Sequence, residues 1–150
     1  MIHRSWLIFS LLFIVSVNTY SQSSGFGVGV MIGEPTGISL KNWISGTTAL
    51  DVGVAWGFDK KGAFHVHSDY LIHDYELIKT SHGRLPVYYG IGGRILLTSD
   101  SRVGIRWIVG LDYMFRKTPI DIFFEVVPIF DLVPGTEFSF NAGLGFRYYL

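Results

Sequence analysis

The sequence has no cysteine, and this absence excludes several kinds of chemistry. Without a thiol the chain forms no disulfide, no thiolate zinc site and no cysteine nucleophile. It also lacks an excess of charge of either sign, because its 150 residues include 12 basic and 12 acidic side chains. A nucleic-acid-binding domain needs a basic surface that neutralises phosphates. We therefore expect no nucleic-acid partner.

Long hydrophobic runs are also missing, apart from one near the N-terminus. Residues 6–17 (WLIFSLLFIVSV) follow a short basic start that contains Arg4, and polar residues come next. A transmembrane helix needs about 20 apolar residues, so this run is too short. The order of basic start, apolar stretch and polar end is typical of a secretory signal peptide. We predict a signal peptide over residues 1–21, cleaved after Ser21, and one domain over residues 22–150; the alternative is an uncleaved N-terminal anchor.

After residue 22, no stretch shows the 3.6-residue apolar period of an amphipathic helix. Apolar residues alternate with glycine, polar and charged residues instead, which is the pattern of β-strands. Short segments rich in Gly, Pro, Ser and Asp separate the alternating runs and predict turns. The pattern predicts eight strands, over residues 25–33, 38–44, 49–58, 63–73, 87–98, 103–116, 121–133 and 137–150.

One of these runs breaks the alternation. In residues 38–44, Asn42 falls on the apolar face and Trp43 on the polar face. An extra residue in a strand shifts the faces in this way, so we expect a β-bulge in this segment.

The sequence is rich in glycine and aromatic residues, with 18 Gly, 12 Phe, 8 Tyr and 4 Trp. Glycine and single charges occupy the face opposite the apolar one, although glycine is unfavourable on an exposed strand face. It suits a crowded interior. The apolar face carries aromatic residues toward its ends, as transmembrane barrels do: Trp56, Phe58, Tyr70, Tyr89, Tyr113, Phe115, Phe146 and Tyr148.

These observations predict an all-β fold, an eight-stranded antiparallel up-and-down transmembrane β-barrel with a glycine-rich, charged and filled interior. A closed barrel pairs every backbone amide and carbonyl group, which a lipid environment requires. The alternative is a soluble, lipocalin-like barrel in which the two faces are inverted and the aromatic residues fill the lumen.

The inward charges are predicted to form one salt-bridged network. Eight strands leave an interior just wide enough for side chains to fill, and buried charges must be paired because isolated ones are strongly destabilising. The predicted members are Lys41, Asp51, Asp69, Arg94, Arg106, Asp112, Glu125, Asp131 and Arg147.

Over residues 25–150 the chain resembles the small outer-membrane barrels, namely the transmembrane domain of OmpA, OmpX and their relatives. It is more similar still to a family of small outer-membrane barrels to which no function is assigned. The segments that carry the resemblance are GEPTGISLKNW (33–43), HVHSDYLIHDY (65–75), LPVYYGIGGRI (85–95), PIDIFFEVVPIFDLVP (119–134) and NAGLGFRYYL (141–150). The resemblance implies the porin-like barrel fold and an outer-membrane location, and it implies no activity.

The resemblance also implies partners. Such barrels contact outer-membrane lipid, and the barrel-insertion machinery recognises their C-terminal strand. They usually end in an aromatic residue, whereas this sequence ends in Leu150, preceded by Tyr148 and Tyr149. We expect a weaker terminal signal and a monomer.

Two groups of residues carry side chains that are common in metal sites or catalytic sites. His65, His67 and Asp69 share one strand face, and imidazoles at this spacing can bind zinc; the simpler interpretation is that they belong to the polar interior. Some outer-membrane barrels are lipid-modifying enzymes with a lipid-facing Ser and His, but here Ser68 faces away from His65 and His67. We predict no enzymatic activity, no metal site and no cofactor.

The function expected from the sequence is a structural or surface-interaction role in the outer membrane, without a wide pore. A second hypothesis is a narrow channel or a binding protein for a small ligand. It would use the rim of the barrel near Pro35, Lys60, Arg102 and Pro134. An enzyme that modifies outer-membrane lipid is the third.

Overall fold

The structure, a computed structural model, describes residues 24–34, 36–56 and 63–150, and these form eight β-strands. Every predicted strand is present, with ends that differ from the prediction by at most two residues. No helix in these residues is long and apolar enough to cross a membrane. The strands are β1 (Phe26–Gly33), β2 (Gly37–Trp43), β3 (Thr48–Trp56), β4 (Phe64–Asp74), β5 (Val87–Leu97), β6 (Arg102–Met114), β7 (Ile120–Val133) and β8 (Glu137–Tyr149).

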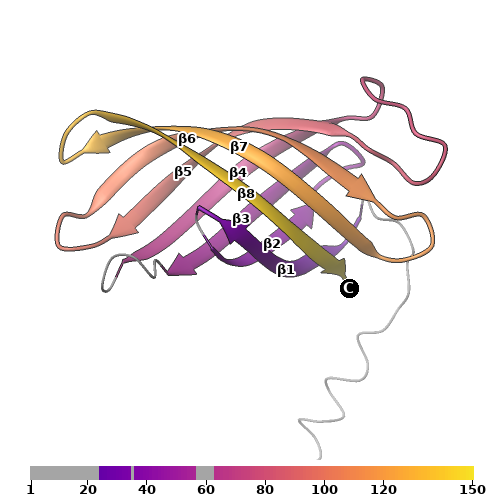
Figure 1. The fold of residues 1–150 in the computed structure, drawn as a ribbon, viewed down its shortest axis with the longest axis horizontal. Helices are drawn as coiled ribbons and strands as arrows, with labels where there is room; N and C mark the ends of the chain where they lie inside the picture. The colour runs from indigo at the N-terminus through magenta and orange to yellow at the C-terminus, as the bar shows by residue number, and fades with distance from the viewer. Residues whose placement is uncertain (1–23, 35, 57–62) are drawn as a thin grey trace, which may run out of the picture.

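The strands close into a barrel. Each strand pairs antiparallel with the next one in the chain, and β8 returns to pair with β1 from Gly27↔Tyr149 to Gly33↔Gly143. The strands cross the barrel obliquely, and the C-terminus lies at one end of it (Figure 1). The predicted eight-stranded antiparallel up-and-down barrel is therefore confirmed.

The expected bulge in residues 38–44 is wrong. β2 pairs with β1 and with β3 without a shift of register. Trp43 points inward at the end of a regular strand and Asn42 points outward. The irregularity lies elsewhere, between β6 and β7, where the register shifts between Val103 and Gly104.

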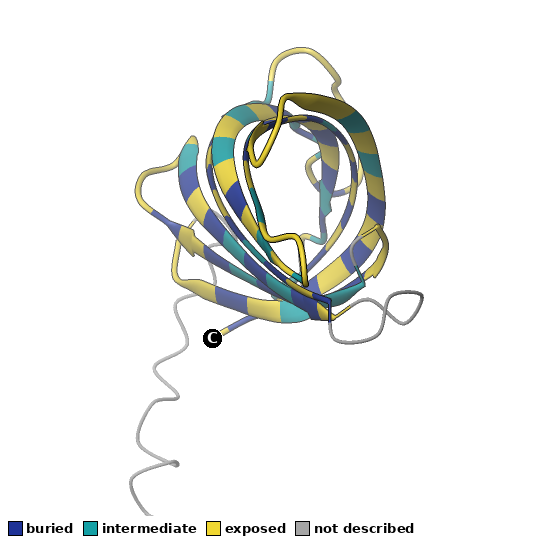
Figure 2. Cartoon of the chain, turned by 90° about the vertical axis from the view of Figure 1, so that its left-hand side faces the viewer, coloured by how far each residue is buried: buried dark blue, intermediate teal, exposed yellow. Residues whose placement is uncertain are grey.

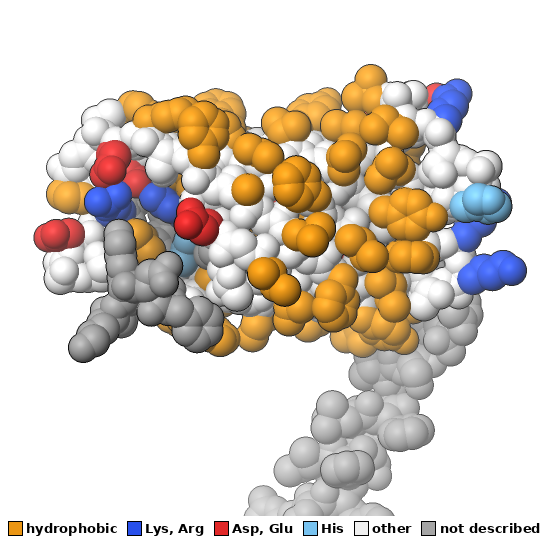
Figure 3. Space-filling model, viewed as in Figure 1, with side chains coloured by type: hydrophobic (Ala, Val, Ile, Leu, Met, Phe, Trp, Pro, Cys, Tyr) orange, Lys and Arg blue, Asp and Glu red, His pale blue; other side chains and the backbone are white. Residues whose placement is uncertain are grey.

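The two faces of the barrel wall differ sharply in chemistry. Buried and exposed residues alternate along the strands (Figure 2). Large apolar side chains are exposed on every strand, from Val28 and Val30 on β1 to Leu144 and Phe146 on β8. They cover the middle of the outer face in Figure 3, where charged side chains gather toward the two ends. The inverted, lipocalin-like arrangement is thereby excluded.

The longest connection, residues 75–86, lies at the same end of the barrel as the C-terminus (Figure 1). Its two ends are fixed to the barrel. The Tyr75 hydroxyl donates to the Gly46 carbonyl at 2.9 Å, and burial raises the pKa of Tyr75 to about 12, so the phenol stays a donor. The backbone of Arg84 exchanges two hydrogen bonds with Met114, at 3.0 and 2.7 Å.

The predicted signal peptide, residues 1–21, lies outside the described residues, as do Pro35, Phe58 and Lys60.

Candidate functional site: the charged interior

The interior of the barrel holds all nine charged residues that the alternation assigned to it, and each is at most 7% exposed. They come from seven of the eight strands, because inward and outward positions alternate along each strand. The residues are Lys41 on β2, Asp51 on β3, Asp69 on β4, Arg94 on β5, Arg106 and Asp112 on β6, Glu125 and Asp131 on β7, and Arg147 on β8.

Toward the end of the barrel at which β5 connects to β6, Arg94 and Asp131 form a bidentate ion pair. Arg94 donates from Nε and Nη2 to the two carboxylate oxygens of Asp131, at 3.0 and 2.6 Å. Such paired, charge-assisted bonds are the strong form of this interaction. Arg102, which is half-buried at the rim, lies 2.8 Å from Glu137 and 3.8 Å from Asp131.

In the middle of the barrel, Arg106 lies between two acids. Its Nε donates to Asp69 at 3.1 Å, and its Nη2 is 3.8 Å from Glu125. Glu125 accepts a hydrogen bond from the Tyr88 hydroxyl at 2.8 Å. Tyr88 lies wholly inside the barrel, on the same face of β5 as Arg94.

Toward the end of the barrel that carries the C-terminus, Arg147 joins β8 to three other strands. It donates to Ser39 at 2.9 Å, to Asp51 at 2.9 Å and to Asp121 at 3.1 Å. The ring of Phe123 lies 3.8 Å from its guanidinium carbon, which adds a cation–π contact.

A second buried cation, Lys41, lies toward the same end of the barrel. Lys41 Nζ lies 2.8 Å from Asp112 and 2.8 Å from His73 Nε2, and 4.4 Å from the centre of the Trp43 ring. The inward position of Trp43, which the sequence pattern did not explain, follows from these contacts: the ring covers the cation and packs at 4.4 Å on His73.

Glycines on intervening strands make the pairing of these side chains possible. Arg94 and Asp131 both lie beside Gly104 in the register, so the bond between them spans the β6 backbone. A Cβ atom at Gly104 would lie 2.3 Å from Asp131 Oδ1. A side chain at that position is incompatible with the ion pair.

The same arrangement recurs in three further places. Arg106 and Asp69 both neighbour Gly92, and Tyr88 and Glu125 both neighbour Gly110. Arg147 and Ser39 both neighbour Gly29. The glycine-rich face therefore gives long polar side chains room to reach a partner two strands away.

Several interior partners were missing from the predicted network. Asp121 is fully buried and binds both Arg147 and the Tyr149 hydroxyl, the latter at 2.5 Å. It lies on the same face of β7 as Glu125, so the alternation alone could have identified it. Tyr88 and His73 lie at inward positions for the same reason.

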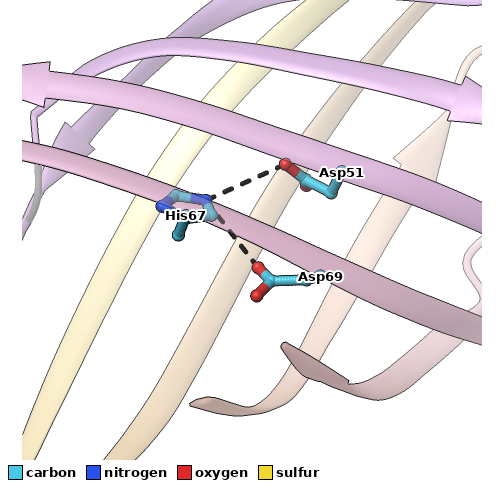
Figure 4. A group of neighbouring side chains, drawn as sticks. All are labelled: Asp51, His67 and Asp69. Atoms are coloured by element: carbon cyan, nitrogen blue, oxygen red, sulfur yellow. Dashed lines mark ion pairs between the residues drawn. The ribbon is translucent and has the colours of Figure 1, made fainter. Parts of the chain in front are cut away.

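The candidate metal ligands differ from the predicted set. His65, His67 and Asp69 all point inward, but the atoms that approach one another belong to Asp51, His67 and Asp69. His67 Nε2 lies 3.9 Å from Asp51 Oδ1 and 3.7 Å from Asp69 Oδ2, between the two carboxylates (Figure 4). Ser68 is exposed on the opposite face of β4, away from both histidines.

The fold resembles a known outer-membrane barrel domain. No protein-family model matches the chain, and no curated protein matches its sequence. Among solved structures, the crystal structure of the N-terminal β-barrel domain of Pseudomonas aeruginosa OprF matches it with a TM-score of 0.55 and 16% sequence identity. The match covers 83% of this chain and 95% of that domain. The predicted resemblance to OmpA-like barrels is confirmed as a resemblance of fold.

Proposed function

We propose that this protein is an integral outer-membrane β-barrel with a structural or surface-interaction role. The observation that carries the proposal is the distribution of side chains: apolar residues face outward on every strand, while the charged residues away from the strand ends face inward. In water this arrangement would expose a continuous apolar surface and bury ionised groups. In a bilayer the same outer face is matched to hydrocarbon, and the closed sheet leaves no backbone edge in lipid.

The barrel is not a wide pore. Its lumen is occupied by buried Arg, Lys, acidic, His and Tyr side chains that hydrogen-bond to one another from wall to wall. An apolar cluster that includes Leu71, Ile108 and Phe123 fills more of the same space. Eight-stranded barrels have this filled interior, whereas porins with 16–18 strands keep an aqueous channel.

The first test is heat modifiability. The chain is refolded in detergent and run on a gel with and without boiling. We expect the unboiled protein to migrate differently and to resist protease. A chain that remains folded and soluble without detergent, and shows no shift, contradicts the proposal.

Planar bilayer recordings then test the absence of a pore. We expect no large, steady, ion-selective current from the folded wild-type barrel. Such a current contradicts the filled interior.

The end that carries the C-terminus is proposed to face the periplasm, as in bacterial barrels with an even number of strands. This places residues 75–86 in the periplasm and the turns after β1, β3, β5 and β7 outside. We propose that the protein is a monomer and that the barrel-insertion machinery recognises β8.

A rim that binds a small ligand is the second candidate function. One observation favours it: a hollow of about 360 Å³ lies between the β5–β6 and β7–β8 turns, lined by Arg102, Pro134 and Glu137, among others. The charged lumen disfavours the related idea of an apolar ligand inside the barrel. Enzymatic activity is disfavoured because Ser68 and His67 lie on opposite faces of the wall.

A further inference from the structure

Three potential metal ligands converge inside the barrel wall. Asp51 on β3 and Asp69 on β4 are direct partners in the register, and His67 precedes Asp69 on the same inward face. Each of the three residues offers one ligand atom that lies within 4.8 Å of those of the other two. His67 Nε2 lies 3.9 Å from Asp51 Oδ1 and 3.7 Å from Asp69 Oδ2. Separations of 3.7 and 3.9 Å from the imidazole nitrogen are too long for hydrogen bonds. They are close to the separation of two atoms that bind one ion.

Each carboxylate already uses its other oxygen. Asp51 Oδ2 accepts from Arg147 at 2.9 Å, and Asp69 Oδ1 accepts from Arg106 at 3.1 Å. These bonds orient both carboxylates and leave one oxygen of each directed at His67. At metal sites, hydrogen bonds from neighbouring residues to the ligand side chains commonly hold those ligands in the orientation that binds the ion.

One of the free oxygens is a buried acceptor without a donor. Asp51 is 3% exposed, and among the described residues its Oδ1 has no hydrogen-bond partner. A buried carboxylate oxygen left in this state is costly. A cation between Asp51 and His67 would satisfy it.

The charge of the interior favours a divalent cation. Among the described residues, the buried charged groups are four cations (Lys41, Arg94, Arg106 and Arg147) and six carboxylates (Asp51, Asp69, Asp112, Asp121, Glu125 and Asp131). Lys41 pairs with Asp112 and Arg94 with Asp131, which leaves two arginines for four carboxylates. One divalent ion bound with a neutral histidine would balance this excess of two negative charges.

Two glycines open the space in which these ligands lie. A Cβ atom at Gly53 would lie 2.1 Å from His67 Cε1, and one at Gly92 would lie 1.9 Å from Asp69 Oδ1. Any other residue at either position would displace a ligand.

We propose that Asp51, His67 and Asp69 bind one zinc ion, which joins β3 to β4 and neutralises the centre of the barrel. Imidazole and carboxylate ligands suit zinc, and three protein ligands leave a fourth position for water. Bonds of about 2.1 Å at tetrahedral angles place ligand atoms about 3.4 Å apart. Both separations from His67 Nε2, 3.7 and 3.9 Å, exceed this value by only a few tenths of an ångström.

Zinc retention tests the proposal. The full chain, without a polyhistidine tag, is refolded in detergent with excess zinc chloride and desalted, and bound zinc is measured by atomic emission. We expect one zinc ion per wild-type barrel. His67→Gln and Asp51→Asn should each weaken zinc binding at least tenfold. His65→Gln is the matched control, because His65 lies inward on the same strand outside the ligand set, and it should retain the full zinc content.

Cobalt(II) provides a second readout that does not depend on a variant. The wild-type barrel refolded with cobalt(II) should show the intense visible absorption of a tetrahedral site, and zinc should abolish it. A wild-type barrel that retains no zinc and shows no such band overturns the proposal, as does equal retention by His67→Gln. Heat modifiability is measured on every sample. A barrel that forms but retains no zinc therefore overturns only the metal site, whereas a chain that forms no barrel overturns the proposed function.

Discussion

Arg147 is the most connected cation of the interior, and replacing it by methionine tests whether the charged network stabilises the barrel. The variant Arg147→Met keeps much of the side-chain volume but removes three hydrogen bonds, to Ser39, Asp51 and Asp121. It also leaves two carboxylates buried without their cation. We expect a large loss of stability for that second reason above all.

The size of the loss follows from the geometry. Three charge-assisted bonds of about 1.5–3 kcal/mol each set an upper bound of about 9 kcal/mol. Breaking a buried ion pair by removing one partner costs about 3–5 kcal/mol. We expect the free energy of unfolding to fall by about 4 kcal/mol, within that range.

The assay is urea-induced unfolding of the refolded barrel in lipid vesicles, followed by tryptophan fluorescence. Lys79→Met is the control, since it removes an ion pair with Glu76 whose side chains are 78% and 82% exposed. That exposed pair should contribute less than about 0.5 kcal/mol.

A second substitution identifies the cause. If the cost comes from unpaired carboxylates, Asp121→Asn should be far less harmful in the Arg147→Met background than in the wild type. The double-mutant cycle should then give a coupling energy of about 1–3 kcal/mol. A loss below about 1 kcal/mol for Arg147→Met, or two additive substitutions, would refute the reasoning and indicate that water already screens these charges.

Two further substitutions test the wall of the barrel. Gly29→Ala places a Cβ atom 1.7 Å from the Phe146 carbonyl oxygen and should reduce the heat-modifiable form on gels, whereas Gly46→Ala, in a turn with open space, should leave it unchanged. Val109→Lys puts a charge on the outer face midway along β6, at a side chain that is 56% exposed. It should lower the free energy of unfolding in bilayers by about 2–4 kcal/mol, and the loss should shrink in detergent; an equal loss in both media argues against a lipid-facing position.

The strands were predictable because two constraints act on every one of them. Most outward residues of this barrel are apolar, and most inward ones are small, polar or charged, so a shift by one residue would bury the wrong set. β4 shows this: Val66, Tyr70 and Ile72 face outward while His67 and Asp69 face inward. Such a pattern determines both the secondary structure and the face of the barrel wall on which each side chain lies.

The rule fails where a side chain finds a specific partner. Trp43 lies inward although it is aromatic, because Lys41 and His73 offer it a cation and a ring. Alternation alone predicts a bulge at this position, because the pattern contains no information about such contacts. They depend on which strands are neighbours and on their register.

The pairing inside the barrel could not be predicted for the same reason. Alternation places Arg94 and Asp131 on the inner face, but it does not show that Gly104 lies between them. In an open sheet a residue pairs with its direct neighbour. In this barrel the strand between the two partners carries a glycine, so Arg94 reaches a partner two strands away. Which residue lies opposite the glycine can be known only from the register of the strands.

These glycines connect the fold to the filled interior of the barrel. A small barrel is too narrow for a long side chain from every strand at each level. At the level of Arg94, Gly104 lies between the arginine and Asp131, and at the level of Tyr88, Gly110 lies between the tyrosine and Glu125. Each glycine leaves space inside the barrel because it has no side chain. The side chains of the two neighbouring strands fill that space and form an ion pair or a hydrogen bond across the glycine. The glycines that make room for the charged side chains inside the barrel are therefore also the ones that let those side chains meet across the lumen and fill it.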